Sequence, residues 1–201
     1  VLFPGLDIGI YVFLLQREQL CAIPESYGGG IEGKIYIKGA DISKYTIGQM
    51  AFISGMLFQD PSGQLTCATV EDEIAFGPEN KGLPVDTINA LVDKYAGYVG
   101  MEKLMRRPPQ ALSGGQQQSV AYASVLAMEP EIYVLDEPTS FLDIRHKLEL
   151  LTILKDLVHE KKVAVLMSLH ELDLAQKLSD YIVCVKGEYI ERSGTPEEIF
   201  T

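Results

Sequence analysis

The second half of the chain alternates short apolar segments with amphipathic helical patterns. Residues 131–137 form an apolar segment that ends in Asp136 and Glu137, a helical pattern covers about residues 144–161, and a second apolar segment spans residues 163–167. Strands that alternate with helices are typical of α/β folds, because parallel strands need crossover connections. We therefore expect an α/β fold with a mostly parallel sheet, whose strand ends form the edge where ligands usually bind.

Further strands are predicted on both sides of this region. Residues 9–15 (GIYVFLL) form a β-branched and aromatic run typical of a buried strand, and residues 32–38 alternate as a half-exposed strand does. An apolar run over residues 50–58 predicts a strand that leads into Gln59. A late hairpin is expected over residues 181–192.

The middle of the chain is predicted to be helical. Thr69 followed by Asp72 resembles a capping start, residues 87–99 carry apolar side chains at helical spacing, and a further helix is expected over residues 113–128. This stretch interrupts the α/β pattern, so we expect an inserted helical subdomain. The predicted segments are residues 1–68 for the first part of the core, 69–127 for the helical subdomain and 128–201 for the rest of the core.

Composition excludes several classes of protein. The 201 residues carry 17 basic and 28 acidic side chains, a net charge of −11, and no basic run of five or more residues. This charge pattern disfavours a protein that binds the phosphate backbone of nucleic acids independently of sequence. The longest apolar stretch, residues 8–15, is too short to span a membrane, and no secretory leader is seen. Three cysteines without CxxC spacing suit a reducing compartment. We expect an acidic, soluble, intracellular domain.

Two adjacent acids end the apolar segment 131–137. One carboxylate there can hold Mg²⁺, because this hard ion prefers oxygen ligands. The next residue, facing the other way on an extended chain, can orient or deprotonate a water that attacks a phosphate. An acidic strand end that binds nothing is the alternative, so Asp136 and Glu137 alone do not decide between the two.

A serine and two glycines open the helix predicted over residues 113–128. Ser113-Gly114-Gly115 at a helix start exposes backbone N–H groups at the positive end of the helix dipole, an arrangement that binds anions. The same residues could be only a flexible helix cap. Gln59 and His170 each follow a predicted strand, which places them at the same sheet edge as Asp136. There the imidazole could contact a phosphate or the attacking water, although such lone residues are more often structural.

Taken together, these motifs resemble an ABC-type ATPase domain. The order and spacing of Gln59, LSGGQ at 112–116, IYVLDEPTS at 132–140, Asp143 and His170 carry the resemblance, which covers about residue 26 to the end. Within that superfamily the chain is similar to the ATPases of energy-coupling-factor transporters, which drive uptake of cobalt, nickel or vitamins. The segments that carry this closer likeness are FQDPSGQL (58–65), TVEDEIAFGPEN (69–80) and GTPEEIF (194–200).

The resemblance implies a P-loop NTPase-like core, ATP and Mg²⁺ as ligands, and a role for each motif residue. Gln59 is the Q-loop residue near Mg²⁺; Ser113, Gly114, Gly115 and Gln116 form the signature that binds the γ-phosphate of ATP on another subunit; Asp136 binds Mg²⁺; Glu137 is the general base; Asp143 is the D-loop residue; His170 is the switch histidine.

The same resemblance implies partners and a location. Because the signature of one subunit completes the site of another, the working unit is expected to be a head-to-tail dimer of ATPase subunits. The dimer would sit on a transmembrane coupling subunit and a substrate-binding membrane subunit, at the cytoplasmic face of the membrane. No nucleic-acid partner is expected. The transported metal ion or vitamin is not identified by this chain.

One expected motif is missing. The family places GxxxxGK[ST], the Walker A motif, after the first buried strand, but residues 16–21 (QREQLC) contain neither glycine nor lysine. Residues 28–34 fit GxxxxGK, yet Ile35 follows and the next pattern is a strand, not a helix. Smaller departures are Ser119 in place of an arginine and Phe141 in place of a small residue.

Three explanations stay open for this departure. The chain is a degenerate subunit that offers only LSGGQ to a partner's ATP, an altered or incomplete copy of an active ATPase, or a protein that binds nucleotide through a rearranged loop. We rank the altered copy first, because Glu137 and His170 are retained. A soluble ABC ATPase of DNA repair or translation is a weaker reading, since the chain shows neither a long coiled-coil insertion nor tandem domains.

Overall fold

Six strands form one twisted sheet in the computed structural model, which describes residues 9–15, 36–37, 39–60, 63–140, 142, 144–186 and 189–201. Neighbouring strands are parallel, except that the last two are antiparallel. In spatial order the strands are β4 (Ser54–Leu57), β5 (Ile132–Leu135), β6 (Ala164–Leu169), β1 (Gly9–Leu15), β7 (Tyr181–Lys186) and β8 (Tyr189–Gly194). The predicted mostly parallel sheet is confirmed, as is the late hairpin.

The register of the sheet brings three strand ends to one edge. Leu57 of β4 pairs with Leu135 of β5, which pairs with Met167 of β6. The residues that follow these strands therefore emerge side by side, as parallel pairing requires. The backbone N–H of Asp136 donates to the carbonyl of Leu57 at 2.9 Å, which extends the pairing of β4 and β5 to this edge.

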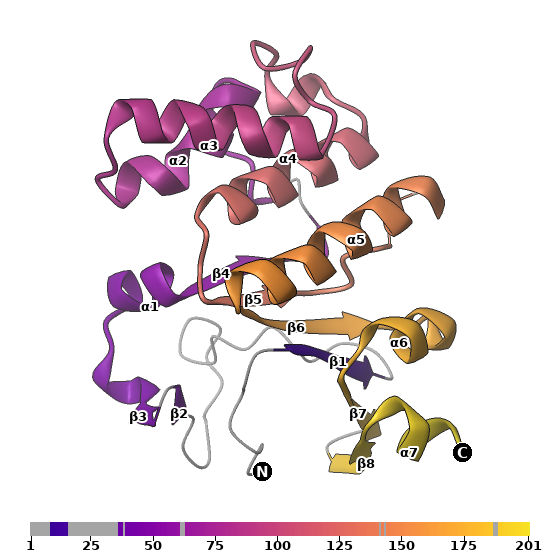
Figure 1. Ribbon diagram of the computed structural model, residues 1–201. Coiled ribbons are helices and arrows are strands. Elements are labelled where there is room, and N and C mark those ends of the chain that lie inside the picture. The colour runs from indigo at the N-terminus through magenta and orange to yellow at the C-terminus, as the bar shows by residue number, and fades with distance from the viewer. Residues whose placement is uncertain are drawn as a thin grey trace.

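The helices that follow β4 divide into two groups (Figure 1). Three of them, labelled at the top of the view, pack on one another, and the last of the three also packs on β4. They are α2 (Val70–Asn80), α3 (Val85–Tyr98) and α4 (Gly114–Ala127). The helices that follow α4 are α5 (Ile144–Lys161), α6 (Leu172–Leu178) and α7 (Pro196–Phe200), of which α5 and α6 contact β1 and β6.

Helix α4 joins the helical group to the sheet. Nine of its fourteen residues are buried, so most of its surface lies against other elements. Gly55 of β4 permits the close approach, because a Cβ at this position would lie 2.9 Å from Pro130 and 3.0 Å from Val125. A continuous apolar core results, and its fully buried members include Val12, Leu57 and Leu126.

The sequence prediction for residues 50–58 was wrong in its first half. Residues 47–53 form a helix, α1 (Ile47–Ile53), and only Ser54–Leu57 are a strand. The reason is local: Thr46 and Gln49 form a capping box that starts a helix directly before the strand. At the other predicted strand, residues 32–38, the described part is β2 (Tyr36–Ile37), which pairs with β3 (Ala40–Asp41).

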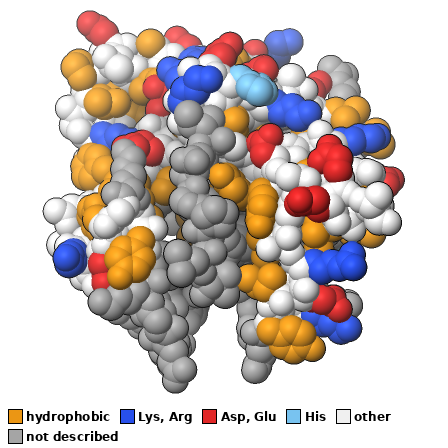
Figure 2. All heavy atoms as spheres, turned by 60° about the horizontal axis from the view of Figure 1, so that its bottom comes forward, with side chains coloured by type: hydrophobic (Ala, Val, Ile, Leu, Met, Phe, Trp, Pro, Cys, Tyr) orange, Lys and Arg blue, Asp and Glu red, His pale blue; other side chains and the backbone are white. Residues whose placement is uncertain are grey.

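Among the described residues, no helix is both long enough and apolar enough to cross a membrane. The face in Figure 2 shows acidic, basic and hydrophobic side chains interspersed over its described part. Cys67 and Cys184 are both free thiols in the structure.

Candidate functional site

The candidate site lies where β4, β5 and β6 end. Gln59 follows β4, Asp136 and Glu137 follow β5, and His170 follows β6. The sequence prediction that these side chains share one edge agrees with this arrangement. The edge also includes the end of β1, but residues 16–35, with both the QREQLC stretch and the GxxxxGK-like segment, lie outside the described residues.

Glu137 sits at a sharp turn and not on an extended chain, which corrects the sequence expectation. Its φ is +43°, in the left-handed region that side chains other than glycine rarely adopt. The backbone is held there from two sides. The N–H of Glu137 donates to Ser168 Oγ at 2.7 Å, and the N–H of Ser140 donates to the Glu137 carbonyl at 3.1 Å. The turn aims the carboxylate at the ends of the neighbouring strands.

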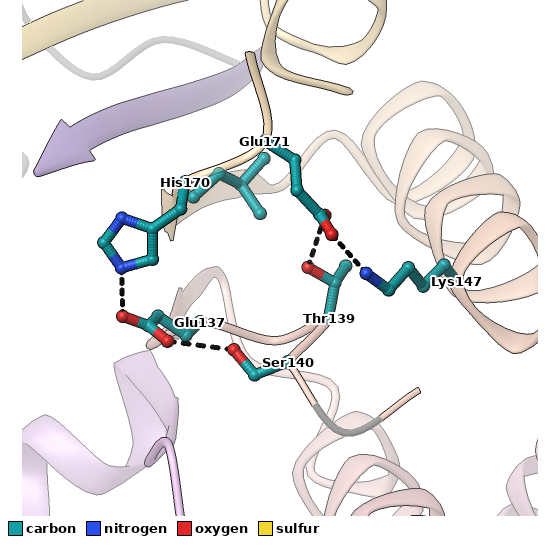
Figure 3. Close-up of a pocket in the computed structure, with 7 residues that line it drawn as sticks. Glu137, Thr139, Ser140, Lys147, His170 and Glu171 are labelled. Atoms are coloured by element: carbon teal, nitrogen blue, oxygen red, sulfur yellow. Dashed lines mark hydrogen bonds and ion pairs between the residues drawn. The ribbon is translucent and has the colours of Figure 1, made fainter. Parts of the chain in front are cut away.

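Three donors converge on the Glu137 carboxylate. Gln59 Nε2 donates to Oε2 at 2.7 Å, and Ser140 Oγ donates to the same oxygen at 2.9 Å. His170 Nε2 contacts the other oxygen, Oε1 (Figure 3). Each donor comes from a different strand end or turn, so the carboxylate is the point at which β4, β5 and β6 are joined by side chains.

These contacts set the charge state of Glu137. Burial alone would raise the pKa of this carboxyl, but the hydrogen bonds from His170 and Ser140 outweigh it and lower the pKa below its ordinary value. Glu137 is therefore ionised at neutral pH, as a group that accepts a proton from water must be. Its side chain is 20% exposed, which leaves the carboxylate reachable from the pocket.

Asp136 offers an oxygen donor beside this base. Its Oδ1 accepts a hydrogen bond of 2.7 Å from Ser168 Oγ, so one serine orients both acids. Mg²⁺ is commonly held by one or two carboxylates, with phosphates and water completing the shell. Asp136 and the amide oxygen of Gln59 fit such a sparse set. No cluster of three or more acidic, histidine or cysteine side chains that could hold a metal occurs within the described ranges.

A small pocket of about 140 Å³ opens beside the carboxylate. This volume suits a phosphate-sized group, whereas sites for larger ligands exceed about 300 Å³. Its lining residues are Glu137, Thr139, Ser140, Lys147, Leu169, His170 and Glu171. Figure 3 shows that one wall is a chain of contacts in which Lys147 and Thr139 both meet the carboxylate of Glu171.

The predicted signature residues lie at the start of α4. Ser113 is the N-cap, and Ser113 and Gln116 form a capping box: Gln116 N donates to Ser113 Oγ, and Ser113 N donates to Gln116 Oε1 at 3.0 Å. Ser113 and Gly114 are exposed. The first-turn N–H groups of a helix have no intrahelical acceptors, so this exposed end can receive an anion.

The structure does not bring the signature to Glu137 within one chain. Tyr122, in the middle of α4, donates its hydroxyl to the carbonyl of Pro138, next to Glu137. Ser113 lies nine residues before Tyr122, which corresponds to about 13 Å of helix rise. Asp143, the predicted D-loop residue, lies outside the described residues.

Sequence reasoning missed several residues that build the site. Ser168 is a buried polar residue in an otherwise apolar strand, two positions before His170, and that pattern could have marked it. Thr139, Ser140, Lys147 and Glu171 had no comparable pattern, because their contacts join segments far apart in sequence.

Comparison with known proteins decides the family. The family profile described as "ABC transporter" matches residues 20–140, more than half of the chain. The chain belongs to the ABC transporter family. Its α/β fold with a mostly parallel sheet is the P-loop NTPase-like fold of ABC ATPases, as the sequence predicted.

Relatives of this ABC transporter family member bear one recurring name. The "Energy-coupling factor transporter ATP-binding protein EcfA" of Methanoculleus marisnigri is 39% identical over 84% of this chain and 61% of its own length. EcfA1 of Streptococcus agalactiae is 38% identical over 84% of this chain and 60% of its own length. The chain thus spans about three fifths of the length of these relatives.

A solved structure agrees in fold with this ABC family chain. The structure of cbiO1 from Clostridium perfringens, described as part of the ABC transporter complex cbiONQ, superposes with a TM-score of 0.77 at 29% identity. The match covers 96% of this chain and 80% of the other chain.

Proposed function

We propose that the chain is the ATP-binding subunit of an energy-coupling-factor type transporter, and that it couples ATP binding and hydrolysis to uptake of a metal ion or vitamin. The observation that carries this proposal is the convergence of Gln59 and His170 on the carboxylate of Glu137. The names of the EcfA relatives and of the cbiO1 structure support the transporter class.

In this proposal Glu137 is the general base for the attacking water, and His170 contacts the γ-phosphate. Asp136 and Gln59 would hold Mg²⁺, which supplies charge neutralisation on the phosphates when bound. Glu137 is suited to its role because it is ionised, fixed by its turn and open to the pocket. Asp143 is the D-loop residue of this scheme.

The signature would act on a second subunit. Ser113, Gly114, Gly115 and Gln116 would bind the γ-phosphate of ATP held by a partner, in a head-to-tail dimer. Two features support this: the exposed helix start and its distance from the chain's own Glu137. The dimer would contact a transmembrane coupling subunit and a substrate-binding membrane subunit at the cytoplasmic membrane face. Residues 69–127 would be the helical subdomain between the core segments 1–68 and 128–201.

A second function is favoured by one specific observation. Residues 16–21 lack the glycines and lysine of a Walker A motif, whereas LSGGQ is intact. A chain without its own phosphate cradle could still dock on a competent ATPase and supply only the signature. In that case the chain alone hydrolyses no ATP, and it stimulates a partner subunit.

One set of ATPase assays separates the two functions. Glu137→Gln is expected to lower turnover of the chain about 10²- to 10⁴-fold, because it removes the base and keeps the shape. Glu160→Gln, an exposed position near the end of α5, is the matched control and should keep full turnover. Unchanged turnover in Glu137→Gln contradicts the role of Glu137.

The same assay, run after mixing with a competent EcfA-type ATPase, tests the second function. In this mixture, Ser113→Arg should abolish the stimulation of the partner. Glu137→Gln should not, because the ATP site that this chain's signature completes belongs to the partner. Stimulation that survives Ser113→Arg would exclude the signature role.

A further inference from the structure

Two loops at the candidate site are joined by three side-chain connections in a row. Residues 136–140 follow β5, and residues 168–171 close β6 and lead into α6. The first connection is Ser168, which bonds Asp136 Oδ1 and the N–H of Glu137. The second is the contact between His170 and Glu137. The third does not involve the predicted catalytic groups.

That third connection is made by Glu171. Its Oε2 accepts a hydrogen bond of 3.0 Å from Thr139 Oγ1, and its Oε1 contacts Lys147 Nζ, which reaches in from α5 (Figure 3). The Glu171 carbonyl accepts from Leu174 and Ala175, which ties the residue to the first turn of α6. Glu171 is therefore held by three separate segments, and His170 is its immediate neighbour.

Two of the three partners in this connection are partly buried. Thr139 is 4% exposed and the Lys147 side chain is 20% exposed, while the Glu171 side chain between them is 40% exposed, so these contacts are partly shielded from water and salt. The His170 side chain is 45% exposed, and among the hydrogen bonds of the described residues it has a contact to Glu137 alone. The imidazole thus depends on the backbone of residues 170–171 for its position.

We propose that Lys147 and Glu171 are positioning residues for His170: together with Thr139 they hold the loop after β6 against the turn of Glu137, so that the imidazole reaches the carboxylate. The assignment rests on the proposed function, in which Glu137 and His170 act on ATP. Lys147 itself does not touch the reacting atoms. It acts by orienting the Glu171 carboxylate toward Thr139.

The direct test measures the ring-nitrogen chemical shifts of His170 by two-dimensional ¹H–¹⁵N NMR of the full chain. The chain has three histidines, and His170→Gln identifies the signal. Lys147→Met keeps the aliphatic stem and removes the cation, and Thr139→Val removes only the hydroxyl. Both should move the His170 ring-nitrogen signals toward those of the Glu137→Gln variant, in which the carboxylate that contacts the imidazole is absent.

Two variants show whether the effect is specific. Lys147→Arg keeps the cation and should retain the wild-type signals. Lys155→Met is the matched control, because Lys155 also lies on α5 and bonds a carbonyl of α6, that of Lys177, at 3.1 Å. It should leave the His170 signals unmoved. A merely structural role of α5 lysines would make the two methionine variants behave alike.

Wild-type His170 signals in both Lys147→Met and Thr139→Val overturn the proposal. Circular dichroism establishes that each variant is folded, and if Lys147→Met does not fold, Thr139→Val decides alone. ATP hydrolysis adds a separate measurement: Lys147→Met should lower kcat about 10- to 100-fold at unchanged KM, since a shift of about 1 Å can cost that much. If the wild-type chain hydrolyses no ATP, the proposed function fails while the NMR result still decides the positioning role.

Discussion

The two candidate functional regions of this chain are built in opposite ways. Glu137 is held by side chains from the ends of β4 and β6 and from its own turn, through residues as distant in sequence as Gln59 and His170. The signature at the start of α4 is held by its own capping box, in which Ser113 and Gln116 bond each other, and the Ser113 carbonyl accepts from the N–H of Gln117 in the same helix. One region is a product of tertiary packing and the other of local sequence.

This difference has a consequence for function. A carboxylate fixed by three donors is preorganised before any ligand arrives, and preorganisation is what makes an electrostatic site effective. A capped and exposed helix end needs no other part of its own chain, so it can be offered intact to a second subunit. Among the hydrogen bonds of the described residues, one joins α4 to the turn of Glu137, that from Tyr122 to the carbonyl of Pro138.

Tyr122→Phe breaks that link and should have the largest effect on stability. Tyr122 is buried, and burial raises the pKa of its hydroxyl far above the ordinary value, so it remains a donor at every accessible pH. Removing it leaves a buried carbonyl without its donor, which costs about 1–3 kcal/mol. Urea unfolding measures the loss. Tyr181→Phe, whose hydroxyl bonds Ser193 at an exposed site, should cost less than about 0.5 kcal/mol. Equal costs for the two variants would contradict the link.

Ser113→Ala tests whether the signature end is locally built. Loss of the N-cap should lower the free energy of unfolding by about 1 kcal/mol and speed hydrogen exchange of the Gln116 amide. The His170 ring signals should stay at their wild-type values, because the hydrogen bonds of Ser113 among the described residues are with Gln116 and Gln117 of its own helix. Ser113→Thr keeps the hydroxyl and should restore most of the stability. Movement of the His170 signals in Ser113→Ala would show that the two regions are coupled.

A smaller difference between the two regions is expected in how the free energy of unfolding depends on pH. The pKa of Glu137 is lowered in the folded chain, so its contribution is present above its unfolded pKa of about 4.5 and is lost as pH falls through the folded value. Between about pH 6 and about pH 3, wild type should therefore lose more stability than Glu137→Gln. Ser113→Ala serves as the control and should keep the wild-type slope. If stability depends on pH equally in Glu137→Gln and in wild type, the hydrogen bonds to the Glu137 carboxylate do not stabilise its ionised form.

Much of the fold followed from sequence patterns. The helix predicted over residues 144–161 is α5 with the same bounds, and the strands that precede Glu137 and His170 lie where the apolar segments are. The meeting of strand-end residues followed from parallel pairing alone. The extent of the strand before Gln59 was not predicted correctly, because the capping box at Thr46 turns half of an apolar run into a helix.

The sequence by itself determined the order and type of most elements, the edge at which the acids lie and the motifs that mark the ABC family, because these depend on periodicity, capping and spacing along the chain. Only the tertiary structure decided the left-handed turn of Glu137, the three donors on its carboxylate and the link from Lys147 through Glu171 to Thr139. The physical reason is the short range of a hydrogen bond, about 3 Å. Such contacts require α5 and the ends of β4, β5 and β6 to be in place at once, and no local pattern specifies that.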